Sequence, residues 1–462
     1  MKPPETSRIQ PPAFAVVWCG IFAACTLSSL ALSAAPYFAI KVVDEQTGRG
    51  VPLVELRTVH NVVFVTDSNG LIAFYEPGLM NHEVFFHVRS HGYQYPKDRF
   101  GYAGVRLRVT PGGSATIKLK RNNIAERLYR ITGEGIYRDT VLLGQKPPIR
   151  EPLLNGQVIG QDSVQVVPYR GKLYWFWGDT NRPQYPLGQF QTSGATSELH
   201  GTDPGVGIEL SYFVDKTGFS KRMVPLKERG PVWIEGLLTV KDETGRERLI
   251  ARYSRMKDIG TVLEHGLVIF NDETEQFDRL VQFDLKDQTR CPRGHAVRVG
   301  DHFYFAKPFA TVRVRATLAD LKTQARYEEL PVPDAPKDVD TQRPVKLHNG
   351  SIRWNDYRKK WIMIAVQEGG RSSFLGEIWY SESDHVAGPW PWAKKIVTHD
   401  RYSFYNPVHH SFFDQEGGRF IYFEGTYAET FSGNPVPTPR YDYNQIMYRL
   451  DLADQRLRLP AR

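Results

Sequence analysis

Short runs of alternating hydrophobic and polar residues make up most of the chain, and residues that favour turns separate them. The N-terminal part contains four such runs, at 38–43, 51–56, 71–74 and 115–119. Alternation with a period of two is the pattern of a strand with one buried face. Long runs with helical periodicity are scarce. Residues 36–120 are therefore expected to form a small β-sandwich.

The same N-terminal region carries a sequence resemblance. VVDEQTGRGVPLVELRT, followed by VTDSNGLIAF, resembles the carboxypeptidase regulatory-like modules that are attached to many secreted enzymes. The resemblance covers about 80 residues and implies a spacer or binding module rather than a catalytic domain. Residues 121–150 contain Asn122-Asn123 and Pro147-Pro148 and are expected to form a linker.

The segment GQDSVQVVPYRGKLYWFWGDT at 160–180 predicts a β-hairpin with an aspartate at each end. Arg170-Gly171 suits a two-residue turn, so 169 should pair with 172 and, counting outward, Asp162 with Asp179. Opposed residues of an antiparallel pair lie on one face, with Cβ atoms roughly 4.5–5.5 Å apart. Two carboxylates this close repel each other, and one pKa should rise. The pair is either an acid/base or substrate-binding site, or two strand-end aspartates that accept hydrogen bonds in turns.

Four later segments repeat the plan of this hairpin, each with a polar residue at the start of its first strand. If Asp162 starts the first unit, then Glu235, His295, Asn349 and Asn406 start the others, at spacings of 73, 60, 54 and 57 residues. This is the size of a propeller blade. Residues 151–462 are therefore expected to form a five-bladed β-propeller, so that the fold is all-β with the sandwich first. A large β-sandwich is the alternative, but it does not explain five polar strand starts at this spacing.

The first 35 residues have the plan of a secretory signal peptide. Basic residues precede the apolar run from Ala13 to Leu32, and small residues follow it at Ser33-Ala34-Ala35. An export signal predicts a periplasmic, extracellular or cell-surface protein. A retained membrane anchor is the alternative, because the run approaches the length of a spanning helix.

Composition and charge narrow the function. Aromatic residues make up 12% of the chain, and Gly and Pro number 39 and 31, as suits a β protein with many turns. The net charge of +8 is spread along the chain without a basic block, so we expect no nucleic-acid partner, and no protein partner is indicated. A basic surface is compatible with an anionic glycan. No GxSxG, HExxH or P-loop motif occurs.

If the five strand starts converge, one end of the propeller channel gathers several carboxylates. Glu424 joins them, because the hairpin count places it near Val408 and His409. Glycoside hydrolysis needs a carboxylic acid at the leaving oxygen and a carboxylate that serves water or the anomeric carbon. Aromatic rings there would stack on sugar faces, although most should pack in the core. The candidates are Trp175, Trp177, Trp233, Tyr405 and Tyr427.

Residues 151–462 resemble the five-bladed propeller glycosidases of the arabinanase and β-xylosidase type. The resemblance lies in Gln161-Asp162-Ser163, in HNGSIRWNDYRKKWIMIAVQEGG and in GEIWYSESDHVAGPW. Phe176-Trp177-Gly178-Asp179-Thr180 also resembles the Gly-Asp-Thr motif of propeller endo-D-arabinanases. The resemblance to the propeller glycosidases covers about 300 residues.

By this resemblance, Asp162 matches the catalytic aspartate of the first blade and Asp179 the Gly-Asp-Thr aspartate. Relatives have a glutamate at the start of blade three, where this chain reads Arg293-Gly294-His295. Glu235 is the nearest substitute as general acid. His295 matches a channel histidine that supports bound calcium in some relatives, or it is a hydrogen-bonded channel residue. No other cofactor is expected.

The leading hypothesis is a secreted glycoside hydrolase that acts on a polysaccharide or oligosaccharide. We expect Asp162, Asp179 and Glu235 to be catalytic. The expected substrate-binding residues are His295, Asn349, Asn406, His409, Glu424, Trp177 and Trp233. A propeller that only binds glycan, or one that mediates attachment at the cell surface, is the alternative.

Overall fold

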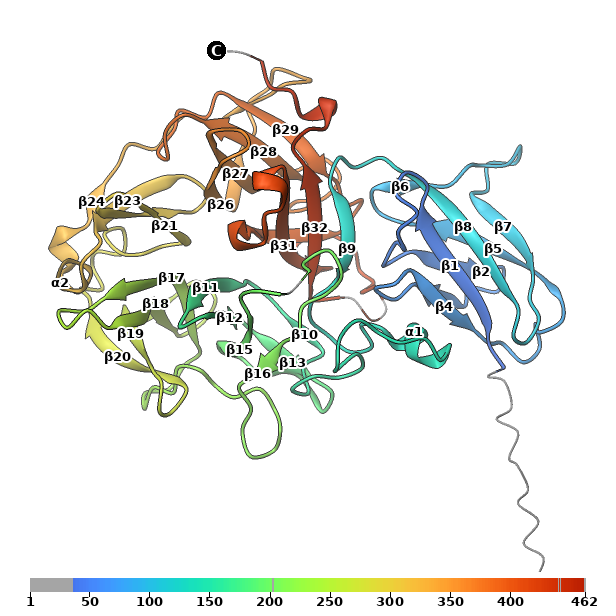
Figure 1. Cartoon of the computed structure of the whole chain (residues 1–462), viewed down its shortest axis with the longest axis horizontal. Helices are drawn as coiled ribbons and strands as arrows, with labels where there is room; N and C mark the ends of the chain where they lie inside the picture. Colours follow the sequence, from blue (N-terminus) through green and yellow to red (C-terminus); the bar gives the residue numbers. More distant parts are fainter. Residues whose placement is uncertain (1–35, 202, 439, 441, 461–462) are drawn as a thin grey trace, which may run out of the picture. The chain divides into compact units, whose positions relative to one another are not determined.

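The computed structural model describes residues 36–201, 203–438, 440 and 442–460 (Figure 1). The expected signal peptide at 1–35 lies outside these residues. Almost all regular structure in the described part is β, with two short α-helices, α1 (Arg138–Leu142) and α2 (Leu318–Leu321), and four single-turn 3-10 helices. None of the helices in the described ranges is long and apolar enough to span a membrane.

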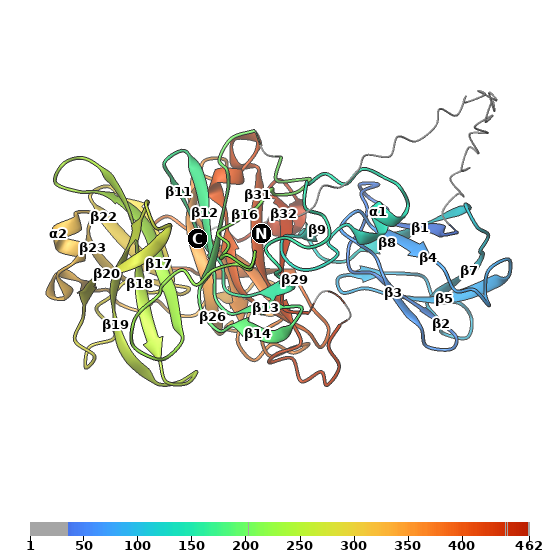
Figure 2. The same ribbon diagram turned by 90° about the horizontal axis from the view of Figure 1, so that it is seen from below.

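The N-terminal strands form two four-stranded sheets that face each other (Figure 2). One sheet has the order β4-β1-β8-β6, with β1 Phe38–Asp44, β4 Leu71–Phe74, β6 Tyr93–Gln94 and β8 Ser114–Arg121. The other has the order β3-β2-β5-β7, with β2 Glu55–Thr58, β3 Val63–Val65, β5 Glu83–Arg89 and β7 Gly104–Arg108. Alternate residues of both sheets, such as Ile40, Leu56 and Phe86, are buried between them. The expected sandwich is confirmed.

Five further sheets each contain four antiparallel strands, as blades of a propeller do, and in the first four of them these strands follow one another in sequence. Sheet 1 contains β11 Gln165–Tyr169, β12 Lys172–Trp177, β15 Ser193–Glu198 and β16 Ser211–Tyr212. Sheet 2 contains β17 Val232–Lys241, β18 Glu247–Met256, β19 Val262–Asn271 and β20 Gln276–Gln282. Sheet 3 contains β21 His295–Val299, β22 His302–Ala306, β23 Ala310–Arg315 and β24 Glu328–Glu329.

Sheets 4 and 5 complete the propeller. Sheet 4 contains β26 Leu347–Asn355, β27 Lys360–Gln367, β28 Ile378–Ser383 and β29 Trp392–Val397, with β25 Lys337–Asp338 added at its edge. Sheet 5 contains β30 Ser403–His409, β31 Phe420–Ala428, β32 Asn444–Asp451 and β9 Glu126–Arg130. A small sheet of β10 Gly160–Gln161, β13 Thr180–Arg182 and β14 Tyr185–Gln189 extends the first hairpin.

The expected linker contributes to sheet 5. Strand β9, from the segment 121–150, pairs antiparallel with β32, and Figure 1 shows the two side by side. All five residues of β9 are buried. The last sheet is therefore completed by a strand that precedes the first sheet in sequence, and 121–150 is more than a linker.

A separate hydrophobic cluster fills each of the five spaces between consecutive sheets. Phe176 packs with Phe270 between sheets 1 and 2, and three further clusters join sheets 2 and 3, 3 and 4, and 4 and 5. Trp175 and Trp177 of sheet 1 pack with Tyr422 and Met447 of sheet 5, which closes the ring. The five-bladed propeller is thus a closed ring without an uncovered sheet face between blades.

The first strand of each sheet contacts the first strand of the next, from β11 through β17, β21 and β26 to β30. These five strands therefore line the channel of the propeller. The residues expected to mark the start of each blade lie on them or, for Asp162, just before them. The fold thus brings the predicted starts to one end of one channel, called the mouth below.

Candidate active site

The first hairpin has the predicted register. Tyr169 pairs with Lys172, and positive φ at Arg170 (49°) and Gly171 (78°) fits a type I′ turn. The ladder runs to the pair Gln165–Phe176, and the pair Gln161–Thr180 of the small sheet continues the same count. Asp162 and Asp179 lie between these pairs. They are therefore opposed, as the sequence predicted.

Hydrogen bonds from several directions hold the carboxylate of Asp162. Its Oδ1 accepts from the backbone N–H of Asp179 at 3.0 Å, and its Oδ2 accepts from the hydroxyl of Tyr405 at 3.1 Å. Tyr443 and Ser163 also donate to it. A Cβ atom at Gly178 would lie 2.3 Å from Oδ1, so only glycine permits this approach. The glycine of Gly-Asp-Thr thus makes room for the carboxylate of the opposite strand.

Asp179 has fewer donors and a raised pKa. The indole N–H of Trp233 donates to its Oδ1 at 2.8 Å. Burial, followed by the charge of Asp162, raises the pKa of Asp179 to about 7. Burial also raises the pKa of Asp162, but its hydrogen-bond donors oppose that rise. Since donors favour the charged form, a single negative charge on the pair is better stabilised on Asp162 than on Asp179.

The backbone around Asp162 is unusual. Three residues other than glycine that contact it or its neighbours have positive φ: Ser163 (57°), Asn406 (51°) and Tyr443 (58°). Such conformations cost free energy and cluster where the surrounding structure holds a functional group in place. Asn406 donates from Nδ2 to the Ser163 hydroxyl at 2.7 Å, which links two of the three. Three positive φ values so close together are typical of a functional site, and they indicate one around Asp162.

Irregularities also occur in three other channel-lining strands at the predicted blade starts. Register shifts lie just after Glu235 in β17, just before Asn349 in β26 and around Asn406 in β30. A β-bulge redirects a side chain and is frequent beside active sites. Asn349 Nδ2 donates to Asn406 Oδ1 at 2.5 Å. A series of hydrogen bonds therefore connects sheet 4, through Asn406 of sheet 5, to Ser163. Both asparagines are partly exposed, as substrate-binding residues must be.

Glu235 also lies at the mouth, but its environment does not suit a general acid. Its carboxylate forms ion pairs with Arg252 and with Lys307, the second at 3.2 Å, and accepts from the Gly294 N–H at 2.9 Å. These partners outweigh the effect of burial and hold the pKa of Glu235 at about 2. A group that is ionised at neutral pH has no proton to donate. The two cationic partners therefore argue against the expected acid role of Glu235.

His295 does not have the surroundings of a calcium site. It is buried at the start of β21, where burial and the charge of Arg353 lower its pKa to about 3, and Lys307 adds to the effect. Calcium takes six to eight oxygen ligands and is disfavoured beside cations. In the described part of the chain, no group of three or more His, Cys, Asp or Glu side chains could hold a metal. The residues present fit a neutral channel histidine and not a calcium ligand.

Three other predicted binding residues are too deeply buried to contact a polysaccharide. Trp177 is 1% exposed and stacks on Trp175 in the core between sheets 5 and 1. His409 is fully buried, with Nε2 2.8 Å from Asp414. Glu424 pairs with Val408 as expected, yet it is fully buried against His410, with Oε1 2.8 Å from Nε2. The substrate-binding role expected for these three is wrong, because they face the packed interior.

Trp233 is the aromatic residue that the structure places at the site as expected. It is partly exposed, and its ring centroid lies 5.9 Å from that of Phe190. Tyr405 is mostly buried and acts through its hydroxyl rather than its ring face. Tyr443 and Phe190 were not predicted. Tyr443 lies in a turn before β32, and no pattern in the sequence links it to Asp162.

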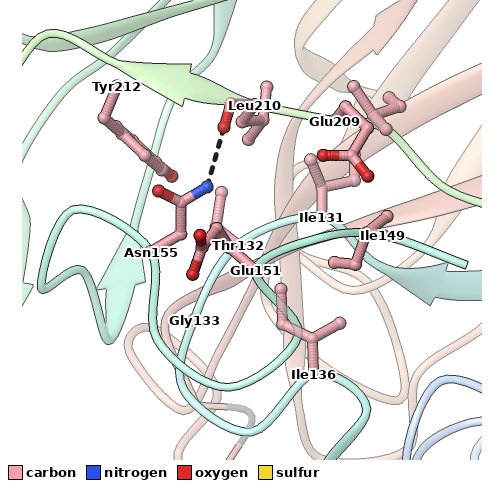
Figure 3. Close-up of a pocket in the computed structure, with 11 residues that line it drawn as sticks. Ile131, Thr132, Gly133, Ile136, Ile149, Glu151, Asn155, Glu209, Leu210 and Tyr212 are labelled. Atoms are coloured by element: carbon pink, nitrogen blue, oxygen red, sulfur yellow. Dashed lines mark hydrogen bonds between the residues drawn. The ribbon is translucent and has the colours of Figure 1, made fainter. Parts of the chain in front are cut away.

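Two of the cavities in the described part of the chain are separate from this carboxylate pair. Figure 3 shows one that is lined by Glu151, Glu209 and Tyr212, among others, in which Asn155 donates to the Leu210 carbonyl at 2.7 Å. Its volume of about 10 Å³ leaves room for one water molecule at most. The other is a groove of about 410 Å³ lined by residues 190–191, Arg222 and 226–231. Of these two, the groove has the size of a ligand site.

Comparison with known proteins gives structural neighbours but no sequence relative. No known protein family matches the chain, and no curated protein matches it. The exo-β-1,3-galactanase of Phanerochaete chrysosporium is 11% identical, over 65% of this chain and 63% of that one, with a TM-score of 0.40. An exo-1,5-α-L-arabinanase from a bovine ruminal metagenomic library is 12% identical, over 64% and 94%, with a TM-score of 0.35.

The neighbours do not all share one chemistry. An N-acetylgalactosamine deacetylase from F. plautii is 11% identical, over 70% of this chain and 94% of that one, with a TM-score of 0.38. Glycoside hydrolases are thus among the structures similar to this chain, at low identity. Likenesses this distant carry no argument for an activity, which has to be argued from the side chains at the mouth.

Proposed function

We propose that the protein is a glycoside hydrolase in which Asp162 and Asp179 carry out the reaction. One observation supports this most: two opposed carboxyl groups at the channel mouth differ in their hydrogen-bond donors, and the one with fewer donors, Asp179, has its pKa raised to about 7. Pairs of carboxyl groups whose surroundings separate their pKa values supply the acid and the base of glycoside hydrolysis. The proposal assigns the acid to Asp179 in place of Glu235.

In this mechanism Asp179 protonates the oxygen of the leaving sugar. Its pKa of about 7 keeps a proton available at neutral pH. The Asp162 carboxylate, held by the Asp179 N–H and by Tyr405, serves the attacking water or the anomeric carbon. Trp233 offers a ring beside Asp179 on which a sugar can stack, and its N–H fixes the orientation of the acid. Asn349 and Asn406 are placed to bind sugar hydroxyl groups.

Glu235 then has a structural role. It forms ion pairs with Arg252 and Lys307 and fixes the loop at Gly294, so it stabilises the wall of the mouth between sheets 2 and 3.

The proposal also includes export of the protein by residues 1–35, with Ala35 or Pro36 as the first residue of the processed chain. N-terminal sequencing of the native protein tests this, and an intact Met1 would contradict it.

The activity is tested by incubating the purified protein with plant, algal and bacterial polysaccharides and measuring new reducing ends. We expect cleavage of at least one polysaccharide, with oligosaccharide or monosaccharide products on chromatography. A protein that binds one of these polysaccharides with micromolar affinity but releases no reducing ends would be a glycan-binding propeller, and the hydrolase proposal would fail.

A further inference from the structure

The groove of about 410 Å³ adjoins the carboxylate pair. Phe190 lines the groove and its ring packs against Trp233, whose N–H donates to Asp179. Pro231 lines the groove as well and precedes β17, on which Trp233 lies. A ligand that stacks on Trp233 at the active site can therefore continue past Phe190 into the groove.

The groove carries positive charge that the protein does not neutralise. Arg222, Lys227 and Arg229 line it and are exposed, and no ion pair among the described residues engages their side chains. Its one carboxylate, Glu228, is already paired with Arg279 at 2.9 Å. Three cations thus face one neutralised anion. Cations gathered in a concave surface raise the local concentration of negatively charged ligands.

The segment 226–231, which carries two of the three cations, has its backbone fixed at Arg229 and Gly230. Arg255 donates from Nη1 to the Arg229 carbonyl at 2.9 Å and is itself paired with Glu264 at 3.2 Å. Gly230 has a φ of 122°, and a Cβ atom there would lie 2.4 Å from the Met256 carbonyl oxygen. The backbone of residues 229 and 230 is therefore packed against the C-terminal end of β18, which fixes the point from which the Arg229 side chain extends.

We propose that this groove binds an acidic stretch of the glycan, in which the sugars carry carboxylate or sulfate groups, beside the linkage at Asp162 and Asp179. This inference rests on the proposed function, and it names the substrate class. An acidic glycan suits the site because cations and stacking rings lie next to each other: the charged substituents meet the cations while the sugar faces meet Trp233 and Phe190.

The test compares two triple variants that lose the same charge. Arg222→Gln/Lys227→Gln/Arg229→Gln alters the groove, and Lys41→Gln/Lys118→Gln/Lys120→Gln alters exposed lysines of the sandwich. Binding is measured to polygalacturonate, which carries carboxylates, to a sulfated galactan, and to neutral arabinan and β-1,3-galactan. We expect the wild-type protein to bind at least one acidic polysaccharide. The groove variant should lose about 10-fold or more in affinity, and the sandwich variant less than about 2-fold.

The acidic arms identify the substituent, because preference for polygalacturonate or for the sulfated galactan distinguishes carboxylate from sulfate. Binding should weaken steeply between 50 and 500 mM salt, since exposed charges are screened. Equal losses in the two triple variants, or neutral polysaccharides bound as tightly as acidic ones, would overturn the proposal. Binding without cleavage would remove the hydrolase function and leave the groove assignment intact. Cleavage of an acidic polysaccharide at an unchanged rate and with unchanged affinity in the groove variant would do the reverse.

Discussion

Replacing Asp179 by asparagine should make the protein more stable at alkaline pH and inactive. Asparagine keeps the shape of the side chain and still accepts the Trp233 N–H, but it has no charge. In the wild-type protein the pKa of Asp179 is about 7 against an ordinary value of 3.8. The folded state therefore binds the proton more tightly than the unfolded state, so this residue lowers stability as pH rises from about 4 to about 7.

The size of the effect follows from the shift. About three pKa units at 1.36 kcal/mol each give roughly 4 kcal/mol above pH 7 and about 1 kcal/mol at pH 4.5. Part of the carboxyl group contacts solvent and its titration is coupled to Asp162, so about half of this is expected. Asp179→Asn should thus gain about 2 kcal/mol at pH 8 and little at pH 4.5.

Thermal unfolding at the two pH values measures the difference. The melting temperature of Asp179→Asn should exceed that of the wild type at pH 8 and match it closely at pH 4.5. Asp98→Asn, which removes a charge from an exposed turn of the sandwich, serves as the control and should behave like the wild type at both pH values. An equal gain in melting temperature at both pH values, or no gain at pH 8, would refute the argument that folding raises the pKa of Asp179.

Four other changes test neighbouring parts of the account. Gly178→Ala should leave the fold intact and lower turnover on the order of 100-fold, because the new Cβ displaces the Asp162 carboxylate; unchanged turnover would show that its position is not critical. Trp233→Phe keeps a ring but removes the N–H, so the pKa of Asp179 should rise and the alkaline limb of the pH–rate profile should move upward; a downward shift would contradict the assignment. Glu235→Gln should lower stability by about 2 kcal/mol or more, since Arg252 and Lys307 lose their partner, while kcat of the folded protein stays within a few-fold of wild type. A chain that starts at Asn122 keeps β9 and should fold, whereas one that starts at Gly133 lacks β9 and should not show cooperative unfolding of the propeller; cooperative unfolding of both would show that β9 is dispensable.

Local patterns predicted much of the fold. The Arg170-Gly171 turn and the alternation around it set the register of the first hairpin, and this register placed Asp162 opposite Asp179. The polar residues Glu235, Asn349 and Asn406 predicted three more strands that line the channel. Each lies in an otherwise apolar strand, and a polar side chain there is unfavourable in the hydrophobic core. What the sequence missed in the fold was β9. Its five residues read as a linker, and only their pairing with β32 makes them a strand.

Roles at the site were harder to predict because they depend on partners far apart in sequence. Glu235 has the residue type of an acid, but Arg252 and Lys307 lie 17 and 72 residues away, and they make it an anion. Trp177 is adjacent to the Gly-Asp-Thr motif, yet the alternation of the strand turns it into the core. Burial, which decides these outcomes, depends on how the blades pack together, and a single strand does not reveal it.

The central claim is that Asp162 and Asp179, and not Glu235, perform hydrolysis. The most direct measurement is the rate of reducing-end release from a cleaved polysaccharide by Asp162→Asn, Asp179→Asn and Glu235→Gln, each corrected for the folded fraction. The account predicts that both aspartate variants lose activity by about 100-fold or more, while Glu235→Gln remains within a few-fold of the wild type. Full activity in either aspartate variant, together with loss of activity in Glu235→Gln, would contradict it.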